Sequence, residues 1–223
     1  MWAKIEAGNI VTMYSNPVRL KDAEGTVYPA SYFTDNTKLA TFSVYPVVFK
    51  NSIPSKTNLY TGGAESFVWN NSKKIVDGTY DYTARSIADV PQVWTQSEID
   101  DGHAPSGTKA GDPKKDRDGN QIIVIGLKTE LTAFVKSLQS SLLNKTDKWV
   151  TRKSEKGTAI PSSVTTYRDG IRTAHTSMIA SIAGAADFDA ICALFDATYN
   201  DAGEETAPAP LYNFPKEPDG MPQ

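Results

Sequence analysis

The chain has 223 residues, a formal net charge of -3, one cysteine and two histidines, and 39% of its residues are hydrophobic. This length allows one large or two small domains with a core, and the slightly negative charge disfavours nucleic acid and anionic membranes, which attract clustered positive charge. The apolar runs are far shorter than the ~20 residues of a membrane helix, and one thiol beside two imidazoles excludes an internal disulfide and the usual Cys/His zinc site.

The first fourteen residues predict a β-hairpin. Residues 2–6 and 10–14 alternate between apolar and polar side chains on either side of Ala7-Gly8-Asn9. We expect Gly8 and Asn9 to take the positive φ that a tight turn requires. The simpler interpretation is a strand of an ordinary β domain. In the alternative, the first strand docks on a partner, with Trp2 as the contact residue.

A short helix and a strand are predicted next. Residues 34–42 predict the helix, with Thr34 or Asp35 as its cap. Residues 44–49 predict the strand, and Pro46 within it indicates an edge position because proline lacks a backbone donor. An edge strand can pair with another chain. Tyr45 and Val47 are therefore candidate contact residues.

Two further strands complete the predicted antiparallel, β-rich N-terminal domain, residues 1–95. They comprise residues 66–70 and residues 79–85. Tyr80 and Tyr82 share one face of the second strand because side chains alternate with a period of two. Packing on the sheet is the favoured interpretation of these tyrosines, and contact with a partner is the alternative.

The segment of residues 96–121 is poor in large apolar groups and rich in Gly, Pro, Asp and Lys. It predicts a long loop, a linker, or an arm held by a partner, since it cannot bury enough apolar surface to order itself. Residues 122–125, Ile-Ile-Val-Ile, follow as a short, fully apolar strand. They open the predicted helical domain, residues 122–200.

A helical hairpin dominates that domain. Apolar residues recur every three or four positions in two segments, which predicts two antiparallel helices joined by the polar turn 152–161. The apolar positions are Leu127, Leu131, Phe134, Leu138 and Leu142 in the first segment and Val164, Tyr167, Ile171, Ala174, Met178 and Ile182 in the second. Residues 187–195, opened by an aspartate cap, predict a third, shorter helix.

The last 23 residues, 201–223, are predicted to form an extended Pro-rich tail. Its prolines are incompatible with a helix or a central strand; they are Pro208, Pro210, Pro215, Pro218 and Pro222. Leu211, Tyr212 and Phe214 form an apolar cluster within it. We expect this cluster to dock in a groove, either of its own chain or of a neighbour.

The residues of the hairpin carry a family resemblance. The resemblance lies in Leu142-Leu143, Thr146-Asp147, Trp149, Ile160-Pro161, Tyr167-Arg168 and Arg172. This pattern resembles the tail assembly chaperone family of tailed bacteriophages, and the C-terminal part of tail or tail-fibre-associated proteins of marine phages. In that family a tryptophan follows the aspartate directly, whereas this chain has Lys148 there and Trp149 next.

No stretch of the sequence matches a recognised catalytic arrangement. Neither His103 nor His175 stands beside a serine or cysteine in a nucleophile setting, and a helical His175 is expected on a polar face. Arg168 and Arg172 lie four residues apart on one helix face and could bind a carboxylate of a partner. Ion pairs with nearby aspartates or Glu155 are the favoured interpretation.

The sequence therefore predicts an α+β protein: a β-rich domain, a helical hairpin with a third short helix, and a tail. The resemblance implies a non-enzymatic structural component of a phage virion, in the baseplate, tail tip or fibre attachment region. Its expected partners are other tail proteins and further copies of itself, without cofactor, metal, nucleic acid or membrane. It would be made in the bacterial cytoplasm and incorporated into the tail. The alternatives are an assembly chaperone absent from the mature particle and a tail-borne hydrolase, which would require paired carboxylates or a metal.

Overall fold

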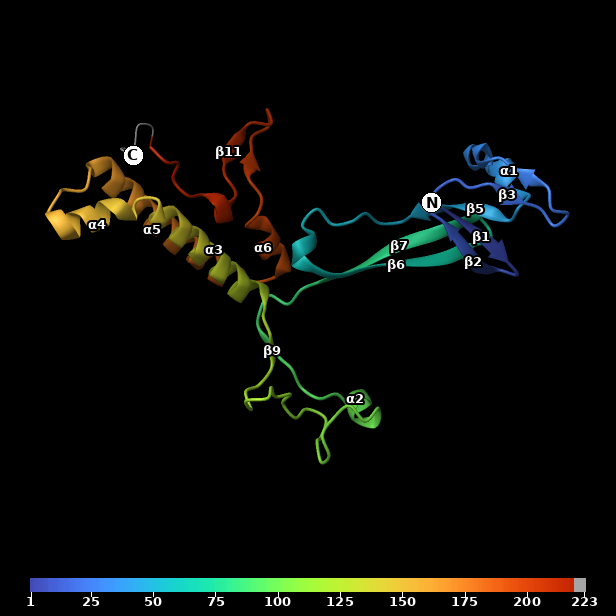
Figure 1. Cartoon of the computed structure of the whole chain (residues 1–223), viewed down its shortest axis with the longest axis horizontal. Helices are drawn as coiled ribbons and strands as arrows, with labels where there is room; N and C mark the ends of the chain where they lie inside the picture. Colours follow the sequence, from blue (N-terminus) through green and yellow to red (C-terminus); the bar gives the residue numbers. More distant parts are fainter. Residues whose placement is uncertain (219–223) are drawn as a thin grey trace. The chain divides into compact units, whose positions relative to one another are not determined.

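The structure is a computed structural model that describes residues 1–218, and it confirms the α+β class (Figure 1). The chain divides into two compact units after Ala84. The predicted boundary lay after residue 95, so residues 85–95 belong with the helical part. Each unit is described by itself below.

The β-rich unit contains one five-stranded sheet with the strand order β2-β1-β5-β7-β6. All neighbouring pairs are antiparallel except β5 and β7, which run parallel, so the predicted antiparallel domain is a mixed sheet. The strands are β1 (Trp2–Glu6), β2 (Asn9–Tyr14), β5 (Val44–Phe49), β6 (Tyr60–Asn70) and β7 (Ile75–Ala84).

The predicted first hairpin is confirmed as β1 and β2, but its turn differs from the prediction. Glu6 pairs with Asn9, which leaves Ala7 and Gly8 as the two turn residues. Their φ angles are 50° and 82°. Positive φ at both central positions is typical of the tight hairpin turn that matches strand twist. Asn9, expected in the turn, is the first residue of β2.

Strand β5 is central in the sheet, so the predicted edge position of this strand is wrong. Residues Val44 to Pro46 pair with β1, and residues Val47 to Phe49 pair with β7 on the other side. Pro46 is the last residue in the register with β1, and the register with β7 begins one residue later. The missing backbone donor of Pro46 therefore falls where the strand changes partners.

Shorter elements pack beside the sheet. Asp35 caps the short helix: its Oδ1 accepts hydrogen bonds from the backbone N of Thr37 and of Lys38, at 3.0 and 3.2 Å. The helix is shorter than the predicted range of residues 34–42, and a 3-10 turn precedes it. These elements are β3 (Leu20–Lys21), β4 (Val27–Tyr28), η1 (Ala30–Thr34), α1 (Asn36–Ala40) and η2 (Thr57–Leu59).

Two apolar clusters form the core of this unit. The first gathers Leu20, Phe33, Leu39 and Val44. The second gathers Ala3, Ile5 and Val76. Val44 of β5 belongs to the first cluster, and Ala3 and Ile5 of β1 belong to the second, so the inner strands of the sheet contribute to both.

The tyrosines of β7 pack on their own sheet, as the favoured interpretation predicted. The ring of Tyr80 stacks on that of Phe49, with centroids 4.4 Å apart and planes 9° apart. Tyr82 lies edge-on to Tyr60 at 6.3 Å. Stacked and edge-on aromatic pairs stabilise a sheet beyond the area that they bury.

The second unit is built on four helices, α3 (Leu127–Asn144), α4 (Asp147–Lys156), α5 (Ser162–Gly184) and α6 (Phe188–Ala193). Helices α3 and α5 are in contact and run antiparallel. Lys128 Nζ donates to the carbonyl of Ala183 at 2.9 Å at one end, and Arg168 donates to the carbonyl of Leu143 at 3.0 Å at the other. The predicted hairpin and third helix are thus present.

The structure changes two details of the hairpin. Val135 is completely buried on α3, whereas Phe134, the predicted core residue, is 39% exposed. The predicted polar turn 152–161 is helical up to Lys156, where α4 ends. Gly157 then takes a φ of 67°, the left-handed conformation that commonly follows a helix. Polar composition here marks an exposed helix, not a turn.

The tail contains more regular structure than predicted. It includes β11 (Glu205–Ala207), which pairs with β10 (Thr198–Tyr199) just before the tail, and one 3-10 turn, η3 (Pro210–Tyr212). Leu211 is fully buried, and its backbone N donates to the carbonyl of Leu194 at 3.1 Å. Pro222, one of the prolines of the predicted extended tail, lies outside the described residues.

Residues 86–126 form a long segment whose first and last residues lie side by side at the start of α3. We call this segment the arm. The backbone N of Leu127 donates to Ser86 O at 2.9 Å, and that of Lys128 to Ile87 O at 3.0 Å. The arm contains β8 (Val90–Pro91), α2 (Gln96–Asp100) and β9 (Ile123–Val124). Residues 96–121, predicted as a loop, a linker or an arm held by a partner, lie inside the second unit and contain the short helix α2.

Candidate interaction surfaces

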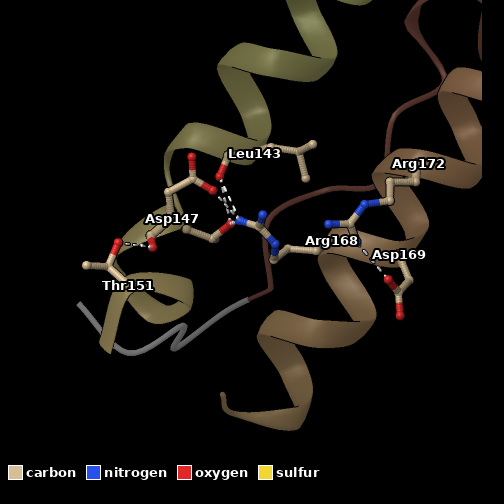
Figure 2. A network of polar contacts seen from close by, with 7 residues as sticks. Leu143, Asp147, Thr151, Arg168, Asp169 and Arg172 are labelled. Carbon is tan, nitrogen blue, oxygen red and sulfur yellow. Dashed lines mark hydrogen bonds and ion pairs between the residues drawn. The ribbon is translucent and has the colours of Figure 1, made fainter. Parts of the chain in front are cut away.

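A buried arginine joins three segments of the helical unit (Figure 2). Nη1 of Arg168, on α5, donates to the carbonyl of Leu143, the hydroxyl of Thr146 and the carboxylate of Asp147, at 3.0, 2.7 and 2.8 Å. Arg168 is only 8% exposed. Since a buried charge requires a partner, this network fixes α4 against the α3–α5 pair. The local ion pair predicted for Arg168 is confirmed, and its guanidinium points into its own chain.

Arg172 differs from Arg168 in its surroundings. Its Nη1 lies 2.9 Å from Oδ1 of Asp169, one turn away on the same helix, and both side chains are more than half exposed. Figure 2 shows this pair separate from the Arg168 network. An exposed pair of this kind contributes little to stability. Arg172 therefore remains accessible to a partner.

Among residues 1–218, two helical side chains have a buried nitrogen atom without a hydrogen-bond partner. They are Nε1 of Trp149 and Nε2 of His175. The Trp149 ring is flanked by Lys148 and Arg152, whose charged groups lie 5.9 and 5.1 Å from its centroid. His175 is half-buried, so its predicted place on a polar face is wrong. No group of three metal-ligating residues among residues 1–218 could hold a metal ion.

The contact residues predicted in the β-rich unit pack within that unit. Trp2 lies edge-on to Phe33, with ring centroids 4.9 Å apart. Tyr45 lies against Trp69 at 4.6 Å, and Val47 packs on the second core cluster. All three are only partly exposed. Their strands lie inside the sheet: β1 lies between β2 and β5, and β5 pairs with β1 over its first half and with β7 over its second.

The three predicted residues of the tail divide between core and surface. Leu211 is fully buried, which places the docking groove on the chain itself. Tyr212 is 54% exposed, with Phe134 and Phe195 at centroid distances of 6.5 and 6.3 Å. Phe214 is half-buried. Of the three, Tyr212 presents the largest exposed fraction.

The arm carries an exposed apolar surface that the sequence did not predict. We name it the arm ribbon: the paired strands β8 and β9 with their flanking residues, from Val90 to Val93 and from Ile122 to Ile125. Its six aliphatic side chains are between 40% and 55% exposed, namely Val90, Val93, Ile122, Ile123, Val124 and Ile125. Side chains alternate between the faces of a strand. Both faces of the ribbon therefore carry apolar groups.

Beyond the ribbon, the arm is ordered by a polar cluster around Glu98. Its carboxylate accepts from the backbone N and the hydroxyl of Thr95, at 3.0 and 2.9 Å, and forms an ion pair with Lys114. Lys114 Nζ lies 4.8 Å from the centroid of Trp94. The hydrogen bond from Lys114, supported by those from Thr95, lowers the pKa of Glu98 to about 2. The cluster holds this end of the arm in one arrangement.

Within residues 1–218 no helix is sufficiently long and apolar to cross a membrane. Comparison of the chain with protein family models, with curated proteins and with solved structures found no match.

Proposed function

We propose that this protein is a non-enzymatic structural component of a tailed-phage virion, where it acts through contacts with other proteins. The observation that carries the contact function is the arm ribbon. Isolated exposed aliphatic side chains are normal on a protein surface, but contiguous ones mark interaction sites. Here six such residues lie close together on one two-stranded ribbon.

The construction of the ribbon favours a protein partner. An isolated two-stranded ribbon is only marginally stable in water, and apolar side chains on both faces gain stability when further protein covers them. The order around Glu98 and the hydrogen bonds at Ser86 and Ile87 hold the arm before it binds. A preorganised arm loses less conformational entropy on association than a flexible one.

The setting in a phage tail is supported by the resemblance of residues 142–172 to tail-associated proteins. The proposed partners are baseplate, tail-tip or fibre proteins, together with further copies of the chain in a symmetric assembly. Arg172 and Tyr212, which are exposed, are secondary contact candidates. The resemblance to tail assembly chaperones supports a second candidate function, a factor that binds a tail subunit during maturation and then leaves.

Quantitative mass spectrometry of purified particles tests the proposal. We expect the protein in mature particles at a stoichiometric copy number, and particles assembled with Ile123→Ser/Ile125→Ser to lack it. Arg117→Ala is the control, because Arg117 lies within the arm but outside the ribbon, and this variant should be incorporated normally. Absence of the wild-type protein from mature particles, with presence on immature tails, would establish the chaperone instead.

A further inference from the structure

The β-rich unit contains a cleft of about 660 Å³ that is independent of the arm. It lies between β1, β2, the β3–β4 pair, η1 and α1, and the buried side chains of Leu20 and Val44 line it. A volume of this size is typical of sites for small organic ligands. Its lining residues are distributed over the first 44 positions, so only the fold brings them together.

One part of the lining is aromatic. Tyr28, Tyr32 and Phe42 form a cluster in which each ring contacts the other two, with centroid distances of 5.0 to 6.2 Å. The Tyr28 hydroxyl donates to Asp22 at 3.0 Å, and Asp22 also accepts from the backbone N of Thr26 at 2.7 Å. These bonds fix the Tyr28 ring. A fixed cluster of three rings offers apolar contact to a planar ligand.

The charged lining residues are mainly cationic. The lining contains four positive side chains and two negative ones, which gives a net charge of +2, although the whole chain carries -3. The positive groups are Lys4, Arg19, Lys21 and Lys38, and the negative ones are Glu6 and Asp22. Lys4 is paired with Glu6 at 2.7 Å, and Lys38 with Asp35 at 3.5 Å.

Arg19 and Lys21 are the two cations of the cleft that remain available. Neither makes an ion pair with any residue in the part of the chain that the structure describes. Asp22 is occupied by Tyr28 and Thr26. Although burial alone would raise its pKa, these hydrogen bonds hold the pKa of Asp22 below its ordinary value, so Asp22 stays charged and engaged at neutral pH.

We propose that this cleft binds a small organic anion in which a phosphate or carboxylate group is joined to a planar ring. Arg19 and Lys21 hold the anionic group, since guanidinium and ammonium groups both bind phosphate and carboxylate. The ring lies against Tyr28, Tyr32 and Phe42. Glu6 and Asp22, already satisfied by Lys4 and by Thr26 and Tyr28, do not compete for the two cations.

Four probes separate the contributions of charge and ring: phenyl phosphate, benzoate, inorganic phosphate and phenol, titrated into the full-length protein and followed by amide NMR. We expect phenyl phosphate or benzoate to shift the amides of the cleft with a millimolar Kd. Inorganic phosphate lacks the ring and phenol lacks the anionic group. Each should therefore bind at least about tenfold more weakly than the tighter-binding of phenyl phosphate and benzoate. The stronger of phenyl phosphate and benzoate identifies the anionic group.

Two double variants then locate the site. Arg19→Ala/Lys21→Ala, which changes only exposed side chains, should weaken the binding of the ring anion by about tenfold or more. Arg117→Ala/Lys136→Ala removes the same charges outside the cleft and should leave the Kd unchanged. Equal binding of inorganic phosphate, equal losses in both variants, or no shift at the cleft would each overturn the proposal. None of these results bears on the arm ribbon.

Discussion

Nη1 of Arg168 lies 2.8 Å from Oδ1 of Asp147, and this contact ties the first residue of α4 to the end of the α3–α5 pair where α3 ends and α5 begins. The same nitrogen serves the carbonyl of Leu143 and the hydroxyl of Thr146. Asp147 also stands in the first turn of α4, where a negative charge is favourable to the helix dipole. One side chain thus orders the junction of three helices.

Arg168→Ala should lower the free energy of unfolding of the helical unit by about 2–3 kcal/mol. The substitution removes the donor to the hydroxyl of Thr146, which is buried, and to the carboxylate of Asp147, whereas the carbonyl of Leu143 still accepts from Thr146. The free energy of unfolding of Arg168→Lys should lie between those of Arg168→Ala and the wild type. Lysine keeps the charge, but its ammonium group cannot reproduce the geometry of the guanidinium. Urea denaturation followed by circular dichroism measures both losses.

Arg172→Ala is the matched control for Arg168→Ala. It removes the same charge from the same helix, but its partner Asp169 and Arg172 itself are exposed. We expect a change within about 0.5 kcal/mol. Equal losses for the two arginines would contradict the structural role given to Arg168.

Gly126→Ala should destabilise the base of the arm by about 2 kcal/mol or more, because the new methyl group would overlap backbone atoms. A Cβ at Gly126 would lie 2.3 Å from the carbonyl carbon of Ala88. Hydrogen exchange at the amides of Leu127 and Lys128 should accelerate. Gly184→Ala is the control, because nothing lies within 4 Å of the Cβ position at Gly184. In this variant the amides of Leu127 and Lys128 should keep their wild-type protection from exchange.

The arm should lose local order in acid through Glu98. Its pKa is about 2 in the folded chain, against an ordinary value of 4.5. Because the folded pKa is depressed, the stabilising contribution is complete above about pH 4.5 and is lost as the pH falls towards 2. Side-chain NMR titration measures the pKa directly. In Lys114→Ala the pKa of Glu98 should rise towards 4.5, and an unchanged value would exclude Lys114 as its main cause.

Ile123→Ser/Ile125→Ser should leave the isolated protein nearly as stable as the wild type. Each side chain is about half exposed, 49% and 55%, so each truncation should cost under about 1 kcal/mol. Thermal unfolding measures this change. A loss as large as that of a core substitution such as Ile171→Ala, about 2–5 kcal/mol, would mean that the arm ribbon is covered by its own chain.

The sequence predicted those elements whose signals are local. Alternation located β1 and β2, helical periodicity located α3 and α5, and aspartate caps located α1 and α6. Each of these depends on neighbours a few residues away. The place of β5 in the sheet could not be predicted this way, because it depends on β7, whose pairing with β5 joins Val47 to Val76. Pro46 suggested an edge, and the change of partner at that residue was not visible in the sequence.

The candidate surfaces were harder to predict than the elements. The run Ile122 to Ile125 is typical of a buried strand, and nothing local indicates that its side chains remain exposed. The cleft depends on residues from Lys4 to Val44 that meet only after folding. Arg168 and Arg172 have the same residue type and helical spacing. They differ in burial: α4 packs over Arg168, which is therefore structural, and leaves Arg172 accessible.

The meeting of Ser86 and Ile87 with Leu127 and Lys128 makes the arm a separable insertion. Its removal and replacement by a short glycine-containing turn would not stretch the remaining chain, because the two cut ends are already within hydrogen-bonding distance. A lineage could therefore lengthen, shorten or exchange this segment while its scaffold stayed constant.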